Sequence, residues 1–130
     1  MEPLRGHSPY GIIHRKVFWG RGGVESWAWW VVTRIRALAA TGRVRFTRKA
    51  LVELYGLGLG LDESDAGEVL ASLSPTESAG RTRSARSGEW MYVFKPQVSA
   101  VPLYLKVILR DECFLISFHA QDESDEEDVS

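Results

Sequence analysis

Three short, strongly apolar runs between residues 90 and 119 constrain the fold more than any other part of the chain. They are WMYVFKP at 90–96, LYLKVIL at 103–109 and CFLISFH at 113–119, and each is rich in aromatic or β-branched residues. Runs of this kind, bounded by turn residues, are typical of β-strands. Because only residues 110–112 separate the last two runs, we expect these two strands to form a hairpin.

Side chains alternate along a strand, so each predicted strand has two faces. In the middle run, Tyr104 and Lys106 share one face. The opposite face carries Leu103, Leu105 and Val107. We expect the last run to divide into Phe114, Ile116 and Phe118 on one face and Cys113, Leu115, Ser117 and His119 on the other. One face of the sheet would then join the core, while the other presents Tyr104, Lys106 and His119 to a polar ligand.

The first half of the chain carries helical patterns. Apolar residues at helical spacing predict a helix over 25–40, and Thr47 is a good N-cap for a second helix over 48–55. An acidic first turn opens a third helix that runs from 62 to 73. Between the first two helices, residues 42–46 alternate as a short edge strand. Residues 74–88 fit either a flexible loop or an edge strand.

These elements predict one α+β domain over residues 25–120. Residues 1–24 are rich in glycine and proline, and we expect an extension that is partly irregular. The start of the chain has no signal-peptide pattern, and the longest aromatic cluster, at 27–32, is too short to span a bilayer. We therefore expect a cytoplasmic protein with no membrane partner. The single cysteine, Cys113, lies in a predicted strand, where a buried, inert thiol is favoured.

The net charge of −1 conceals two parts of opposite sign. Six of the 17 acidic side chains lie between residues 122 and 128, so residues 1–120 carry 16 basic and 11 acidic side chains. One interpretation of residues 121–130 is a solvated, disordered tail. The other is an anionic segment that competes with phosphate groups for the basic surface of the domain.

Three arginines, Arg81, Arg83 and Arg86, follow one another at near-alternating spacing. If this segment is extended, it places guanidinium groups on one side, which suits phosphate binding. A solvated basic loop is the alternative. The chain has no HExxH or CxxC motif and no arguable Ser-His-Asp arrangement, so metal and acyl-transfer chemistry find little support, and we expect no cofactor.

Several motifs together resemble one known family. They are GRVRFTRKAL at 42–51, LGLGLD at 57–62, LS at 73–74, WMYVFKP at 90–96, and YLK with LISF across 104–118. Their order and spacing over roughly residues 35–119 are similar to those of MqsR toxins of type II toxin–antitoxin systems. The resemblance implies a RelE-like antiparallel sheet flanked by helices, with RNA bound on the concave face of the sheet.

The resemblance also implies an activity and partners. Members are metal-independent mRNA endoribonucleases in which the ribose 2′-hydroxyl attacks the adjacent phosphate, and cleavage arrests growth. A cognate antitoxin neutralises the toxin, and operator DNA is reached only through that antitoxin.

The resemblance also implies site residues, by matching positions of this sequence to the family pattern. Tyr104 matches the catalytic tyrosine of the family, His119 stands in place of a lysine, and Arg81, with Arg83 nearby, can replace a second lysine. Histidine is the best acid or base by residue type, because it exchanges protons near neutral pH. Further cations suit contacts with the RNA backbone: Lys106, Arg86, Lys95, Arg43, Arg45, Arg48 and Lys49.

Two departures from the family pattern leave a second hypothesis open. Met91 replaces a glutamine, and residues 78–81 replace an aromatic segment that carries a lysine. The chain could keep the fold and its partner yet cleave RNA weakly or not at all, as a module that binds RNA or a protein. A third hypothesis is DNA binding through the helix at 47–55.

Overall fold

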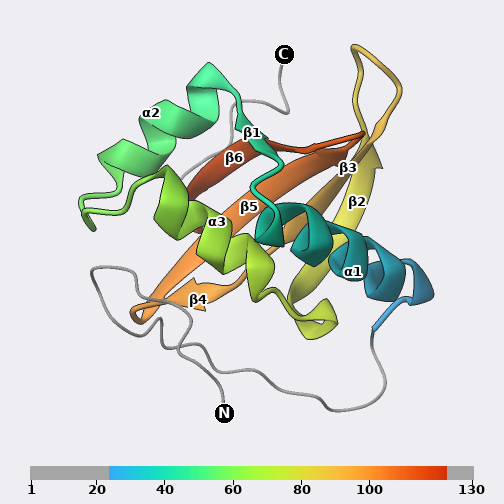
Figure 1. Ribbon diagram of the computed structural model, residues 1–130, viewed down its shortest axis with the longest axis horizontal. Helices are drawn as coiled ribbons and strands as arrows, with labels where there is room; N and C mark the ends of the chain where they lie inside the picture. The colour runs from blue at the N-terminus through green and yellow to red at the C-terminus, as the bar shows by residue number, and fades with distance from the viewer. Residues whose placement is uncertain (1–23, 123–130) are drawn as a thin grey trace.

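The three predicted helices form close to their predicted positions. The computed structural model describes residues 24–122, with α1 at Ser26–Ala40, α2 at Arg48–Gly56 and α3 at Glu63–Ala71 (Figure 1). Thr47 is the N-cap of α2, and its Oγ1 accepts the backbone N–H of Ala50 at 3.1 Å. α3 begins with a capping box, in which the Asp62 and Asp65 side chains each accept the backbone N–H of the other residue.

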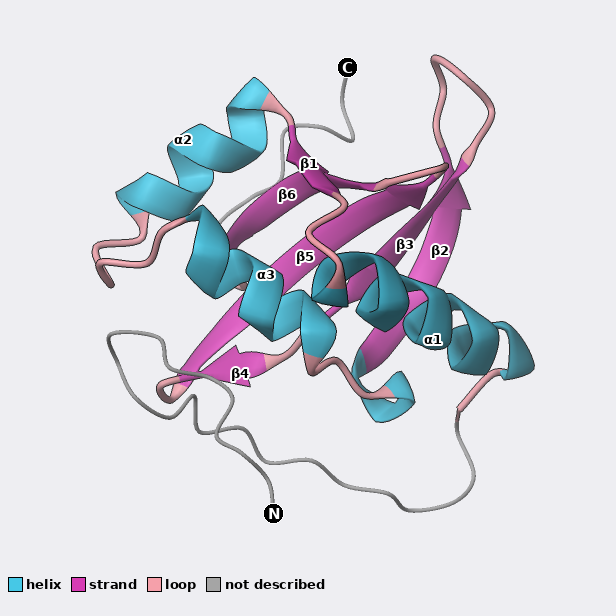
Figure 2. Cartoon of the chain, viewed as in Figure 1, coloured by secondary structure: helices cyan, strands magenta, loops and turns pink. Residues whose placement is uncertain are grey.

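Six strands form one sheet behind these helices (Figure 2). They are β1 (Val44–Phe46), β2 (Ser78–Arg83), β3 (Trp90–Phe94), β4 (Gln97–Val98), β5 (Val101–Leu109) and β6 (Cys113–Ala120). The strand order is β1-β6-β5-β3-β2, and the short β4 pairs with β5. β5 and β6 form the predicted antiparallel hairpin.

The predicted α+β domain, a sheet flanked by helices, is confirmed, and the pairing departs from antiparallel at one edge only, where β1 pairs with β6 in parallel. No tight turn links these two strands, so nothing in the local chain forces them to run in opposite directions. At the other edge, residues 74–88 resolve into a 3-10 turn at Pro75–Glu77 followed by β2, which pairs antiparallel with β3. The edge-strand alternative for this segment is therefore the correct one.

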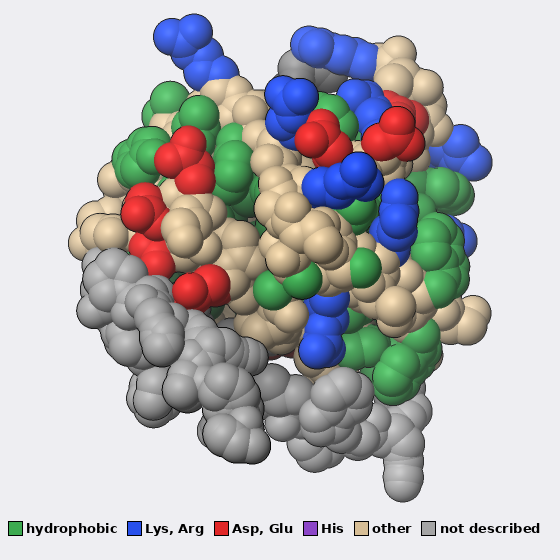
Figure 3. All heavy atoms as spheres, viewed as in Figure 1, with side chains coloured by type: hydrophobic (Ala, Val, Ile, Leu, Met, Phe, Trp, Pro, Cys, Tyr) green, Lys and Arg blue, Asp and Glu red, His purple; other side chains and the backbone are tan. Residues whose placement is uncertain are grey.

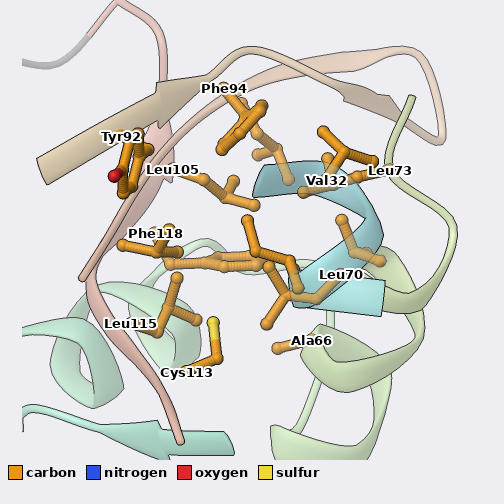
Figure 4. Close-up of a cluster of buried hydrophobic side chains, with 14 of the residues drawn as sticks. Val32, Ala66, Leu70, Leu73, Tyr92, Phe94, Leu105, Cys113, Leu115 and Phe118 are labelled. Atoms are coloured by element: carbon orange, nitrogen blue, oxygen red, sulfur yellow. The ribbon is translucent and has the colours of Figure 1, made fainter. Parts of the chain in front are cut away.

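The hydrophobic core lies between one face of the sheet and the helices. In the views of Figures 1 and 2, α1 and α3 lie across this face, while α2 sits beside β6. Figure 4 shows strand residues such as Phe94, Leu105 and Phe118 directed toward helix residues such as Val32 and Leu70. All five are buried. The opposite face of the sheet is the one that remains for a functional site.

A bulge in β6 changes the predicted alternation. Val107 of β5 pairs with Leu115, but Lys106 pairs with Ser117, so Ile116 is an extra residue in β6. Beyond the bulge, Phe118 joins the core, whereas Ser117 and His119 lie on the opposite face with Lys106. The prediction that Phe118 shares a face with Phe114, and His119 with Cys113, is therefore wrong, because simple alternation cannot cross an inserted residue.

Three further sequence predictions concern Cys113, membrane-spanning helices and the two ends of the chain. Cys113 is buried, and this burial raises the pKa of its thiol to about 12. Among the helices of residues 24–122, none has the length and apolar character needed to cross a membrane. The expectations for the N-terminal extension and the acidic tail concern mainly residues 1–23 and 123–130, which lie outside the described residues.

Candidate active site

A hollow of about 440 Å³ lies on the face of the sheet opposite the helices. Met91, Val93 and Lys95 line it, and they alternate along the chain with Tyr92 and Phe94, which belong to the core. The β2 strand and the β2–β3 hairpin form another wall. The hollow therefore combines an apolar floor, made by Met91 and Val93, with cationic groups above it.

Tyr104 closes the hollow on the β5 side and leads to His119. The two residues pair across β5 and β6, and their rings stack with centroids 5.0 Å apart and planes inclined by 9°. Tyr104 is half-buried, whereas His119 is 2% exposed. The Tyr104 ring therefore lies between the hollow and the buried imidazole of His119.

The backbone fixes the tautomer of His119. Its Nδ1 lies 2.8 Å from the carbonyl oxygen of Ala120. Because a carbonyl oxygen can only accept a hydrogen bond, Nδ1 carries the proton, and Nε2 is the basic nitrogen of the neutral ring. Nε2, the acceptor nitrogen of this tautomer, is itself buried.

Two lysines approach the same face near this pair. Lys106 is fully buried, and its Nζ lies 5.9 Å from the centroid of the Tyr104 ring. Lys49 reaches across from α2, where its Nζ donates to the Ser117 Oγ at 2.9 Å and pairs with Glu53 at 2.8 Å. Ser117 is the cross-strand partner of Lys106, so both lysines lie along the same part of β6.

Glu53 and Ser117 were not among the sequence candidates. Glu53 accepts the backbone N–H of Phe118 at 2.9 Å and so ties α2 to β6 just before His119. Its position four residues after Lys49 on a helix signals an ion pair, which was available from the sequence. The role of Ser117 had no such signal, because simple alternation placed it beside Cys113 and Leu115.

Arg81 and Arg83 border the hollow, but their guanidinium groups point elsewhere. Arg81 pairs with Tyr92 across the strands, and Arg83 pairs with Trp90. Paired residues project to the same side of a sheet, so both arginines project to the side that carries α1. Their guanidinium carbons lie 4.1 and 4.3 Å from the centroid of the Trp90 ring. The structure therefore does not bring these arginines together with Tyr104 and His119.

The other predicted cations divide between the two edges of the sheet. Arg86 and Lys95 line the hollow, near the β2 edge. Arg43, Arg45 and Arg48 lie in and beside β1, at the opposite edge, and Arg45 is paired with Glu112 at 2.8 Å. Of the four basic residues between 43 and 49, Lys49 is the one that donates to Ser117, whose side chain lies on the face of the sheet opposite the core.

Gly80 shapes the wall of the hollow. The β2–β3 register shifts between Ser78 and Arg81, and Gly80 lies within this irregular segment with φ of +112°. L-amino acids with a side chain rarely adopt that conformation, so glycine is required here. The resulting bend lets β2 border the hollow.

Among the described residues, no three His, Cys, Asp or Glu side chains gather in a way that could hold a metal ion.

Comparison with known proteins adds one finding. The family described as "Motility quorum-sensing regulator, toxin of MqsA" matches residues 30–120, which include α1 from its second turn and every strand of the sheet. No curated protein matches the chain. The matched segment contains Tyr104, His119, Lys106 and all residues that line the hollow.

Proposed function

The chain belongs to this family of MqsR toxins, and from that premise we propose that it is an mRNA endoribonuclease. A toxin of this family acts in a toxin–antitoxin system and has an antitoxin protein as its partner. The proposed substrate is mRNA, cleaved in the cytoplasm with growth arrest as the consequence. Operator DNA would be contacted only through the antitoxin.

The proposed reaction uses the ribose 2′-hydroxyl as its nucleophile. His119 Nε2 takes the hydroxyl proton, and O2′ forms a bond to the adjacent phosphorus. The P–O5′ bond breaks, and O5′ leaves with a proton donated by the Tyr104 hydroxyl. The products are a 2′,3′-cyclic phosphate and a free 5′-hydroxyl. The ammonium group of Lys106 supplies positive charge for the phosphorane-like transition state, so the proposed steps need no metal ion.

The stacked pair of Tyr104 and His119 carries this proposal. Tyr104 both lines the hollow and contacts the imidazole, so it links a phosphate bound there to the buried His119 ring behind it. Lys95 and Arg86 line the same hollow and suit the neighbouring phosphates. We leave Arg81 and Arg83 out of the chemical step, because their guanidinium groups lie against Trp90.

The proposal is tested by incubating the purified chain with mRNA in EDTA and analysing the ends of the fragments. The expected products carry cyclic-phosphate ends, and His119→Ala and Tyr104→Phe should each abolish them. Tyr55→Phe is the matched control, because Tyr55 is 55% exposed on α2 and its hydroxyl bonds to Glu63. Equal loss of cleavage in Tyr55→Phe and Tyr104→Phe would contradict the assigned role of Tyr104.

A second candidate function is supported by the floor of the hollow. Met91 and Val93 are buried apolar side chains, and Met91 stands where the family pattern carries a polar glutamine. An apolar floor favours packing against a base or a protein side chain over proton transfer. Intact RNA at high protein excess, together with absent toxicity in cells, would favour a module that binds RNA or a partner without cleaving.

A further inference from the structure

Two arginines and two tryptophans form a ladder of cation–π contacts at the outer edge of the sheet. The guanidinium carbon of Arg81 lies 5.4 Å from the centroid of the Trp27 ring and 4.1 Å from that of Trp90. The guanidinium carbon of Arg83 lies 4.3 Å from the Trp90 centroid. We call Trp27, Arg81, Trp90 and Arg83 the arginine–tryptophan ladder. It joins α1 to the edge strand β2.

The ladder holds its cations ready for an anionic ligand. Arg81 and Arg83 are exposed, and within residues 24–122 neither forms an ion pair with a carboxylate. Arg45 and Arg110, by contrast, are paired with Glu112 and Glu89. A guanidinium group that stacks through its flat face keeps N–H donors along its edge. One Arg83 donor binds the carbonyl oxygen of Gly88 at 2.7 Å, which fixes the side chain further.

An exposed aromatic ring continues this surface along α1. Trp30 is 57% exposed and lies one turn after Trp27, since residues three apart on a helix are neighbours. Arg34, one turn further on, reaches the carbonyl oxygen of Arg110. Figure 3 shows Lys and Arg side chains gathered on this helix-covered face, in the region between α1 and the β2–β3 hairpin.

We propose that the arginine–tryptophan ladder and Trp30 bind the single-stranded RNA that flanks the scissile phosphate. This inference rests on the proposed nuclease function and extends its substrate contacts around β2 to the second face of the sheet. Arg81 and Arg83 lie on β2, which borders the hollow. The RNA would therefore pass from the hollow over this edge of the sheet onto the ladder. Phosphates bind the guanidinium edges, and a base stacks on Trp30.

RNA suits this surface better than an acidic protein segment does. Alternating aromatic rings and cations with no defined pocket are typical of surfaces that bind single strands, where bases stack and phosphates pair with arginines. The adjoining hollow, moreover, is itself proposed to hold RNA. The ladder also packs α1 against β2, so a test must separate RNA binding from that structural contribution.

The experiment measures the affinity of two RNAs whose 2′-hydroxyls are methylated, so that neither can be cleaved. One is about four nucleotides long, enough for the hollow, and the other is about twelve. Arg83→Gln is expected to weaken binding of the longer RNA about tenfold and to reduce its salt slope by about 0.7, the value for one lost single-strand phosphate contact. Binding of the short RNA should not change.

Two further variants keep the result interpretable. Trp30→Ala removes an exposed side chain, so folding should be unaffected while affinity for the longer RNA falls several-fold. Arg36→Gln is the matched control, because Arg36 is exposed, its guanidinium group donates to the carbonyl oxygen of Leu73, and it is not among the candidate RNA contacts. Its effect on both RNAs should be small. Thermal unfolding of each variant identifies any loss of fold.

The proposal is overturned if Arg83→Gln and Trp30→Ala leave the longer RNA unaffected, or if they weaken both RNAs equally. Weaker antitoxin binding with unchanged RNA affinity would also overturn it, and so would the absence of RNA binding by the unaltered chain. The nuclease function fails separately, in the cleavage assay. A chain that cuts no RNA but shows the length-dependent loss would refute the proposed chemistry and support the ladder.

Discussion

Glu53 is expected to stabilise the part of β6 that carries His119. One carboxylate oxygen accepts the buried backbone N–H of Phe118 at 2.9 Å, and the other pairs with Lys49 at 2.8 Å. The two side chains are 18% and 28% exposed, so water screens this pair only in part. Replacing Glu53 should therefore lower the free energy of unfolding more than breaking an exposed ion pair does.

The structure sets the magnitude for two different substitutions. Glu53→Ala leaves the Phe118 N–H without its acceptor, at about 1–3 kcal/mol, and removes an ion pair of up to about 1 kcal/mol. Glu53→Gln keeps an oxygen that can accept the same N–H, so it should cost only about 1 kcal/mol. Glu112→Gln is the control, because its partner Arg45 is 63% exposed, and we expect about 0.5 kcal/mol or less.

Urea unfolding followed by tryptophan fluorescence measures these differences in unfolding free energy. Thermal unfolding provides a check, since the midpoint temperature should fall by about 4 °C for each kcal/mol lost. The expected order of destabilisation is Glu53→Ala, then Glu53→Gln, then Glu112→Gln. If Glu53→Ala is no worse than Glu112→Gln, the contact with Phe118 contributes nothing. If Glu53→Gln is as damaging as Glu53→Ala, the charge matters and the backbone hydrogen bond does not.

Four other outcomes are expected. The Arg110 guanidinium lowers the pKa of Glu89 to about 2 from 4.5, so the carboxylate stabilises the fold above pH 4.5 and loses that effect as the pH falls toward 2; Glu89→Gln should lower the thermal midpoint at pH 7 but not near pH 2. The buried Cys113 thiol, with its pKa raised to about 12, should react with a thiol reagent only after denaturant is added. Gly80→Ala should lower the free energy of unfolding, measured in urea, by about 1–3 kcal/mol, because φ is +112° there. The cost would come from the backbone conformation alone, since no atom lies within 4 Å of an added Cβ. Deleting residues 122–130 should tighten RNA binding, and unchanged affinity would favour the solvated-tail interpretation.

Local signals predicted most of the elements correctly. The α1 stripe of Trp27, Val31, Ile35 and Leu38 is buried as its spacing requires, and Thr47 caps α2 as its residue type suggests. These signals succeed because helix periodicity and capping depend on neighbours in the chain. The hairpin of β5 and β6 was equally accessible, since its turn is only three residues long.

Features that depend on distant contacts were not accessible in the same way. The parallel pairing of β1 with β6 arises from tertiary packing and leaves no local mark in residues 44–46. The two arginines of β2 were correctly recognised as alternating, but alternation alone does not say which face of the sheet the helices cover. Only the pairing of Arg81 with Tyr92 assigns them to the α1 side.

The bulge at Ile116 is the feature on which the candidate site depends. Continued alternation after Leu115 would turn Ser117 and His119 into the apolar core and expose Phe118, which would bury two polar side chains among leucines. The extra residue reverses that outcome and sets His119 beside Tyr104. α2 holds the backbone on both sides of the shift, through Thr47 on the carbonyl oxygen of Ile116 and Glu53 on the N–H of Phe118. These two contacts take the place of a neighbouring strand where β1 has ended, so helix α2 fixes the register that aligns the stacked pair.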